Sequence, residues 1–152
     1  MNTPAQWPLI LDCLRNTLPT LPGFTDVAVY DGYPVTNDAP MDSVTVGYTD
    51  EESGGSFQQT PDPSGCGVIE TGQVRSMIRC NTGDTDPSIT RSRAFALFTA
   101  WSAWINTDQT LGGVLDAQAF IQLSAEVDSV QASQGSATGL LVTLSYQTTV
   151  FG

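Results

Sequence analysis

The segment IQLSAEVDSVQASQGSATGLLVTLSYQ, residues 121–147, predicts the element around which the fold is built. Apolar residues alternate with polar ones in two runs, Ile121, Leu123, Ala125, Val127 and Leu140, Val142, Leu144, Tyr146. A period of two places each run on one face of a strand. Gln134 and Gly135 supply a turn between the runs. The segment therefore predicts a long antiparallel hairpin with one apolar face.

A long helix is predicted before this hairpin. Asp86 can cap its first turn, and Pro87 suits the first helical position, where a backbone N–H has no partner in the helix. The helix is expected to reach about residue 105. Its core stripe follows helical spacing at Ala94, Phe98, Trp101 and Ile105, with Phe95 and Trp104 beside it.

The N-terminal part predicts a second helix and two short strands. Apolar residues at Trp7, Ile10, Leu11, Leu14 and Leu18 follow helical spacing, and proline at position 19 ends the pattern. Short alternating runs over residues 26–30 and 43–48 predict strands, with a turn between them that contains glycine and proline at positions 32 and 34.

A third strand is predicted over residues 68–80, after a long loop. Val74, Ile78 and Cys80 share one side of this strand, whereas Gln73, Arg75 and Arg79 share the other. Gly72 is expected to mark a bulge. The preceding residues 49–66, TDEESGGSFQQTPDPSGC, are rich in glycine, proline and acid, so we expect a loop without helix or strand.

These elements predict one α+β domain that spans residues 1–152. The expected order is helix, three strands, helix, two strands. This order favours a mostly antiparallel sheet of about five strands with the two main helices packed on one face. The other face stays partly polar, so it can meet water or a neighbouring molecule.

The charge of the chain is strongly negative. Sixteen acidic residues oppose five basic ones, all arginine, which gives a net charge of −11. Such a chain repels phosphate backbones, so we expect no specific nucleic-acid binding; the alternative is that the acidity merely keeps the protein in solution. The sequence has no run of 18 apolar residues and no signal-peptide pattern at its start, so we expect no membrane association.

The composition also excludes most catalytic chemistry. Histidine and lysine are absent, which removes histidine-based triads, histidine-ligated metals and Schiff-base lysines. Paired carboxylates remain at Asp50-Glu51-Glu52 and Asp84-Asp86; they fit a hydrolase or a weak calcium site, or simply solvated loop charge and a helix cap. Cys13, Cys66 and Cys80 lack metal or redox spacing and are expected to be reduced. We therefore expect neither enzyme activity nor a cofactor.

Three segments resemble a known family. VAVYDGYP at residues 27–34, followed by DSVTVGY at residues 42–48, is similar to the opening hairpin of the tail terminator (tail completion) proteins of tailed bacteriophages and prophages. RSRAF at residues 91–95 and DQTLGG at residues 108–113 resemble that family's helix entry and helix exit. The resemblance extends roughly from residue 4 to residue 150.

The resemblance implies a structural virion protein that forms a homo-oligomeric ring, typically a hexamer. The ring would cap the tail tube, stop tube polymerisation and offer a docking surface for the head. Its partners would be itself, the major tail tube protein and the head-tail connector protein, while genomic DNA passes through the ring. The protein would assemble in the bacterial cytoplasm and remain in the tail or neck of the virion. The alternatives are a head-tail connector or stopper protein of the same virion, and a carboxylate-based hydrolase.

Two groups of residues are candidate contacts in such an assembly. Asp50, Glu51, Glu52 and Phe57 form a candidate partner-docking loop, in which the aromatic ring fills a pocket and the acids meet basic residues; the alternative is a passive solvated insertion. Arg91 and Arg93 oppose the helix dipole at the start of the long helix and need compensating partners. They would pair locally with Asp84 or Asp86, or form salt bridges to a neighbouring subunit.

Overall fold

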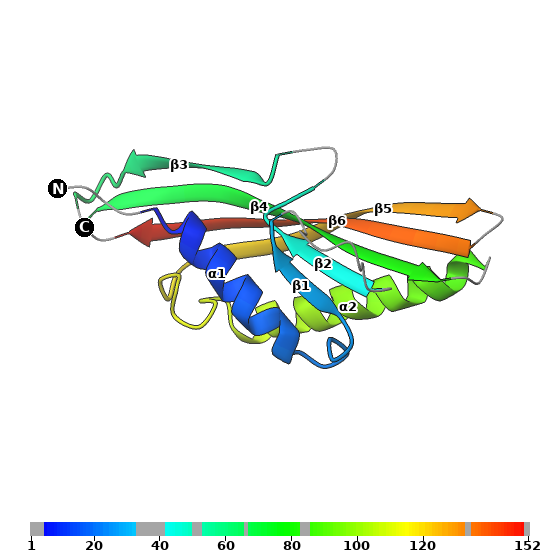
Figure 1. The fold of residues 1–152 in the computed structure, drawn as a ribbon. Coiled ribbons are helices and arrows are strands. Elements are labelled where there is room, and N and C mark those ends of the chain that lie inside the picture. Colours follow the sequence, from blue (N-terminus) through cyan, green and yellow to red (C-terminus); the bar gives the residue numbers. More distant parts are fainter. Residues whose placement is uncertain are drawn as a thin grey trace.

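The computed structural model describes residues 5–32, 42–49, 53–65, 67–82, 86–132 and 135–150. Its helices are α1 (Trp7–Thr17), the 3-10 turn η1 (Leu18–Thr20) and α2 (Pro87–Thr107). Its strands are β1 (Ala28–Asp31), β2 (Asp42–Val46), β3 (Gly55–Pro61), β4 (Val68–Thr82), β5 (Phe120–Ala132) and β6 (Gly135–Val150). Both helices lie on the same side of the sheet, so the predicted α+β class and layer arrangement are confirmed (Figure 1).

The sheet is six-stranded and mostly antiparallel, with the order β1-β2-β4-β6-β5. β3 pairs with the same edge of β4 as β2 does, but with an earlier part of that strand. β4 and β6 form its centre, paired from Val68↔Val150 to Thr82↔Ser136. β5 and β6 pair from Phe120↔Gln147 to Ala132↔Gly135, which confirms the predicted hairpin. The alternating apolar residues of residues 121–147 therefore share the face that the helices cover.

The predicted pairing of the first two strands is wrong. β1 and β2 run parallel, in register from Ala28↔Ser43 to Asp31↔Val46, so they form no hairpin. Gly32 does turn the chain, with φ +80°, and its N–H donates to the Val46 carbonyl over 3.0 Å. A turn signal cannot distinguish a hairpin from the start of a longer crossover, which parallel neighbours require. Residues 33–41, which make the connection, lie outside the described residues.

The predicted loop over residues 49–66 is also wrong in part, because it contains β3. This strand pairs with β4 from Gly55↔Val74 to Pro61↔Val68, so four strands precede α2. The composition of the segment argued against a strand. The edge of β4 that β2 leaves open supplies backbone partners, and such tertiary pairing overrides weak local preference.

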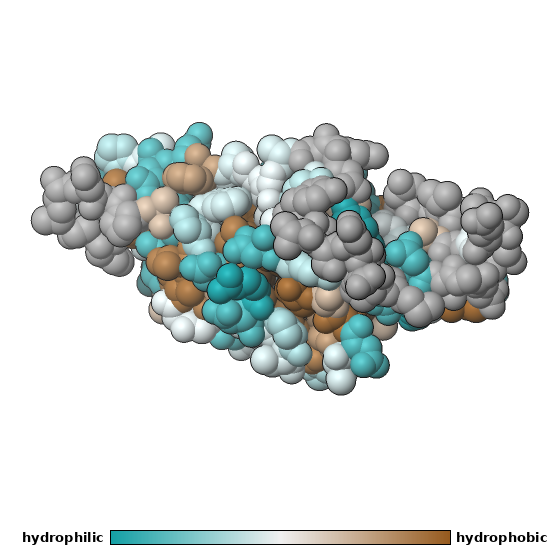
Figure 2. All heavy atoms as spheres, in the orientation of Figure 1, coloured by the Kyte–Doolittle hydropathy of each residue, from teal (hydrophilic) through white to brown (hydrophobic). Residues whose placement is uncertain are grey.

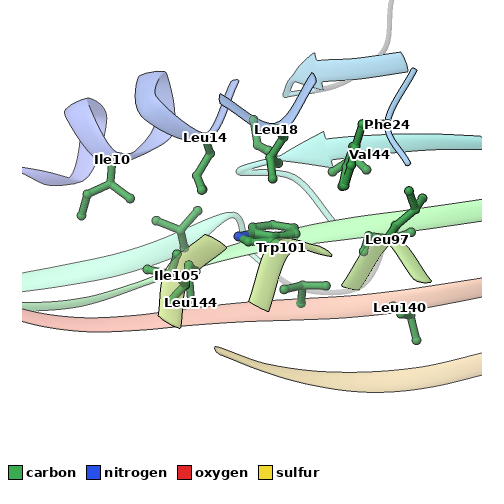
Figure 3. Packing of buried hydrophobic residues seen from close by; sticks show 14 of the residues in the cluster. Ile10, Leu14, Leu18, Phe24, Val44, Leu97, Trp101, Ile105, Leu140 and Leu144 are labelled. Carbon is green, nitrogen blue, oxygen red and sulfur yellow. The ribbon is translucent and has the colours of Figure 1, made fainter. Parts of the chain in front are cut away.

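Helix α2 begins as predicted. Asp86 caps it, since its side chain accepts a hydrogen bond from the Ser88 N–H over 3.0 Å. The buried residues of the helix are Thr90, Ala94, Leu97, Trp101 and Ile105. The predicted stripe is buried except at Phe98, which is only partly buried, while its neighbour Leu97 takes the core position. Of the two aromatic residues expected beside the stripe, Trp104 is partly buried against the core and Phe95 is exposed. Figure 3 shows Trp101 in the middle of the buried cluster, with side chains of α1 and of the sheet around it.

The covered face of β4 carries the predicted set Val74, Ile78 and Cys80, all buried. Gly72 lies on the same strand but makes no bulge, because its register runs unbroken to Phe57 of β3 and Tyr146 of β6. A side chain at Gly72 would instead collide with its neighbours: a Cβ there would lie 2.7 Å from the Tyr146 hydroxyl. Gly72 thus permits the close approach of that hydroxyl rather than a bend.

Candidate assembly surface

The side of the sheet opposite the helices is not covered by any described helix or strand. There a shallow depression of about 550 Å³ crosses β3, β4, β6 and β5. Its outward side chains are hydroxyls and amides, contributed by Ser56, Gln58, Thr71, Gln73, Ser145 and Gln147. The lining includes no carboxylate, arginine or cysteine. This surface can therefore form hydrogen bonds through neutral hydroxyl and amide groups.

Two phenylalanines lie on the two edge strands: Phe120 points to the open side, in register with Gln147, and Phe57 points to the helix side, in register with Gly72 and Tyr146. Phe57 on β3 is 48% exposed, and Phe120 at the start of β5 is 63% exposed. Val127, further along β5, is 50% exposed. In the space-filling view, hydrophobic spheres gather where the helices lie, while β3 shows mainly hydrophilic or neutral spheres (Figure 2).

A buried carboxylate fastens β3 to the rest of the domain. Glu70 on β4 is fully buried and accepts four hydrogen bonds from three residues. Both of its oxygens lie 3.0 Å from the backbone N–H of Gln6, at the start of α1. The Gln59 amide of β3 donates over 2.9 Å and the Tyr146 hydroxyl of β6 over 2.7 Å. One side chain thus ties α1, β3 and β6 to β4.

Glu70 was not among the residues singled out from the sequence. The available signal was its position, because it shares the alternation of Val74 and Ile78 and so had to point into the core. A buried charge requires full hydrogen bonding, and the donors supply it. Burial raises the pKa of the Tyr146 phenol, and the hydrogen bond to Glu70 and its negative charge raise it further. The phenol therefore stays a donor.

Between β2 and β3, the chain at Gly54 lies directly against the chain at Gly47. Gly54 packs so closely on the Gly47 carbonyl that a Cβ at position 54 would not fit. The Arg75 N–H donates to the Gly54 carbonyl over 2.9 Å, and its guanidinium donates to the Ser53 hydroxyl over 2.7 Å. Asp50, Glu51 and Glu52 of the candidate docking loop lie outside the described residues. Phe57, the fourth residue of that candidate set, lies on β3 and not in a loop.

The two arginines at the start of α2 differ. Arg93 forms an ion pair with Asp42 of β2, with 3.1 Å between its Nε and the carboxylate, and also donates to the Asn81 carbonyl. Its partner is neither of the two acids considered from the sequence. Arg91 is exposed and close enough to Asp86 to help lower the pKa of that carboxyl, after the hydrogen bonds from Ser88. Whether either arginine contacts a neighbouring subunit stays a prediction.

The two cysteines within the described residues, Cys13 and Cys80, show no feature of a reactive site. Cys80 is buried and Cys13 partly buried, and both are free thiols. Burial, reinforced by the charge of Asp42, raises the pKa of the Cys80 thiol to about 12. Burial also raises the pKa of Cys13. Cys66 lies outside the described residues. Both described thiols therefore stay protonated at neutral pH and are poor nucleophiles.

Within the described ranges, no three acidic or cysteine side chains gather closely enough to hold a metal ion. Neither α-helix there combines the length and apolar character that crossing a bilayer requires. No protein-family model matches the sequence, and no curated protein matches it.

Proposed function

We propose that the chain is a structural subunit of a tailed-phage virion, one that assembles into a ring and caps the tail tube. The observation that carries the proposal is the section of the sheet formed by β3, β4, β6 and β5, whose side opposite the helices is uncovered within the described residues. Two edge strands, β3 and β5, end this section on opposite sides, and each presents an exposed phenylalanine. Edges of this kind favour association with another strand unless they are covered. A subunit open on two sides suits a ring, in which each copy has two neighbours.

The charge of the chain supports the same function. Each copy carries a net charge of −11. Among the described residues, no arginine lines the surface depression on the sheet, and Arg75 beside it donates to the Gln73 amide oxygen and the Ser53 hydroxyl. A ring through which DNA passes must not hold the phosphate backbone, because each arginine contact strengthens binding. An acidic subunit whose surface depression is lined by hydroxyls and amides supports that role.

The segments that resemble tail terminator proteins also bear on the proposal. RSRAF lies in the first turns of α2, and DQTLGG follows its end, where the Asp108 carboxylate accepts hydrogen bonds from Thr110 and Gly112. These two positions agree with a helix entry and a helix exit. The likeness at residues 27–34 and 42–48 gives less support, since these residues form a parallel pair instead of a hairpin.

Deleting the gene from the phage genome that carries it tests the proposal. A terminator limits tube growth, so electron microscopy should show overlong tails that do not join heads. Supplying the protein from a plasmid should restore tail length and infectivity. Infectious particles with normal tails in its absence would contradict the proposal. Tails of normal length without heads would contradict the capping role and favour the connector alternative.

A further inference from the structure

At the level of Phe120 the sheet is four strands wide, and both outer strands are edges. The row that contains Phe120 runs through Gln147 of β6 and Thr71 of β4 to Gln58 of β3. β5 ends the strand order on one side, and β3 lies at the other side of this row. β1 pairs with β2 only over residues 28–31, so within the described residues it leaves the outer edge of β3 uncovered.

Building on the ring proposed above, we infer that the β5 edge of one copy pairs with the β3 edge of the next copy. The partner of each edge is thus a second copy of this chain, and the sheets of neighbouring copies join into one. Strand directions, side-chain character and charge support this arrangement independently.

The strand directions favour it because the antiparallel alternation continues across the junction. β3 is antiparallel to β4, β4 to β6, and β6 to β5. β3 is therefore antiparallel to β5 of the same copy. A second copy placed beside the first in the same orientation brings its β3 next to the first copy's β5, again antiparallel. Repeating that step uses one edge of each kind per junction, as a heterologous ring requires.

The two faces of the junction also match in polarity. Phe57 is in register with Gly72 and Tyr146, so it points to the helix side of the sheet. On that side β5 presents Ile121 and Leu123, which are only partly buried in the single copy. A continuous sheet keeps its faces, so the exposed ring of Phe57 meets apolar side chains of the neighbour.

The opposite side of the junction carries mainly polar side chains, with Phe120 of β5 as the exposed apolar exception. Ser56 and Gln58 of β3 are exposed there, as are Gln122 and Ser124 of β5. Hydroxyl and amide side chains beside one another can hydrogen-bond across the seam.

Charge selects β3 as the partner of β5. Two copies of net charge −11 repel each other, so contact is favoured where acids are few. β3, with the sequence GSFQQTP, has no ionisable side chain, whereas β5 carries Glu126 and Asp128. A two-fold contact between two β5 edges would bring four carboxylates to one seam; contact with β3 brings two. β1 is a poorer partner because it has four residues and ends at Asp31.

Cysteine cross-linking between two kinds of subunit tests the pairing, in a background in which Cys66→Ser removes one native thiol. One preparation carries Gln58→Cys on β3; others carry Gln122→Cys, Ser124→Cys or Glu126→Cys on β5. A short bismaleimide reaches neighbouring rows, so the three β5 positions cover different registers. Cross-linked dimers are expected when a β3 preparation is mixed with a β5 preparation and not from either alone.

Two results would overturn the inference. Dimers from a β5 preparation alone would show that two β5 edges meet. Rings in electron micrographs without any cross-link in the mixtures would leave the proposed ring intact and refute this contact. Failure of the proposed function looks different, because it appears as normal tails on deletion of the gene.

A pair of substitutions with matched exposure gives a second measurement. Phe57 is 48% exposed and Leu9 on α1 is 47% exposed, but only Phe57 lies at the proposed junction. Phe57→Ser should raise the protein concentration for half-assembly about tenfold, as expected when a central aromatic contact is lost. Leu9→Ser should leave it unchanged, with circular dichroism confirming that both variants fold. Equal effects of the two substitutions would contradict the assignment.

Discussion

The two faces of β4 lie one residue apart in sequence and meet different surroundings. Val74, Ile78 and Cys80 point toward the helices and are buried, whereas Thr71 and Gln73 point into the open depression on the other side. The covered face holds the fold together through close packing. The open face and its two edges add little to a single copy, so their residues are available for contact with another molecule. In the proposed ring, stability and assembly would therefore depend on different residues of the same strands.

The largest expected contrast is between two aromatic residues, one on each side of this division. Trp101 is fully buried, and Trp101→Ala should reduce the free energy of unfolding by about 3–5 kcal/mol, a large part of a domain's total of about 5–15 kcal/mol. Phe120 is 63% exposed, so Phe120→Ala should change it by less than about 0.5 kcal/mol. Urea denaturation followed by circular dichroism measures both. Similar losses of stability in the two variants would contradict the distinction between a stabilising covered face and an open face that adds little to stability.

The next contrast concerns Glu70, the charged group on the covered face. Glu70→Leu leaves donors of Gln6, Gln59 and Tyr146 without an acceptor, and should cost about 3 kcal/mol. Glu70→Gln keeps one carbonyl acceptor at nearly the same volume and should cost about 1 kcal/mol. Hydrogen exchange should accelerate first in β3 and at the start of α1. Uniform acceleration over the whole sheet would argue against a local fastening role.

A smaller effect is expected at the flank of α2. The side chains of Arg93 and Asp42 are 32% and 20% exposed, so their ion pair is partly screened and should contribute about 1 kcal/mol. Arg91→Met, the control on the same helix, should have almost no effect on stability. A double-mutant cycle with Arg93→Met and Asp42→Asn isolates the pair. A coupling energy near zero would mean that the pair does not stabilise the fold.

The smallest effect is a loss of stability in alkali, from groups on the covered face. The folded-state pKa of Cys80 is raised to about 12, above an unfolded value of about 8.5. The stabilisation that the protonated Cys80 thiol contributes is complete below the unfolded pKa. It is lost as pH rises toward the folded-state pKa, because the thiol ionises first in the unfolded chain. Between pH 7 and pH 9 the loss should be about 0.8 kcal/mol.

The stabilisation from Tyr146 is also lost as pH rises, since the folded-state pKa of this phenol is raised as well. This loss of stability begins only above the unfolded pKa of about 10. Urea titrations at several pH values should show a smaller slope for Cys80→Ala below pH 10 and for Tyr146→Phe above it. A stability that rises with pH over this interval would contradict the sign.

Much of the fold follows from local patterns in the sequence. The alternation in residues 121–147 and the Asp86-Pro87 helix start each depend on neighbouring residues alone, and both predictions were correct. The candidate contact residues were harder to place. Asp42 lies far along the chain from Arg93, and the fold brings them together, so no spacing rule could have identified the pair.

The sequence by itself determined the elements with strong periodicity, the covered face of each long strand and the absence of histidine and lysine chemistry. Only the tertiary structure decided that β1 runs parallel to β2, that residues 55–61 become a strand and that Glu70 receives its donors from three distant residues. The physical reason is the range of the interactions. Helix caps and hydrophobic periods act within a few residues, whereas a strand needs a partner edge that exists only after the rest of the sheet has formed.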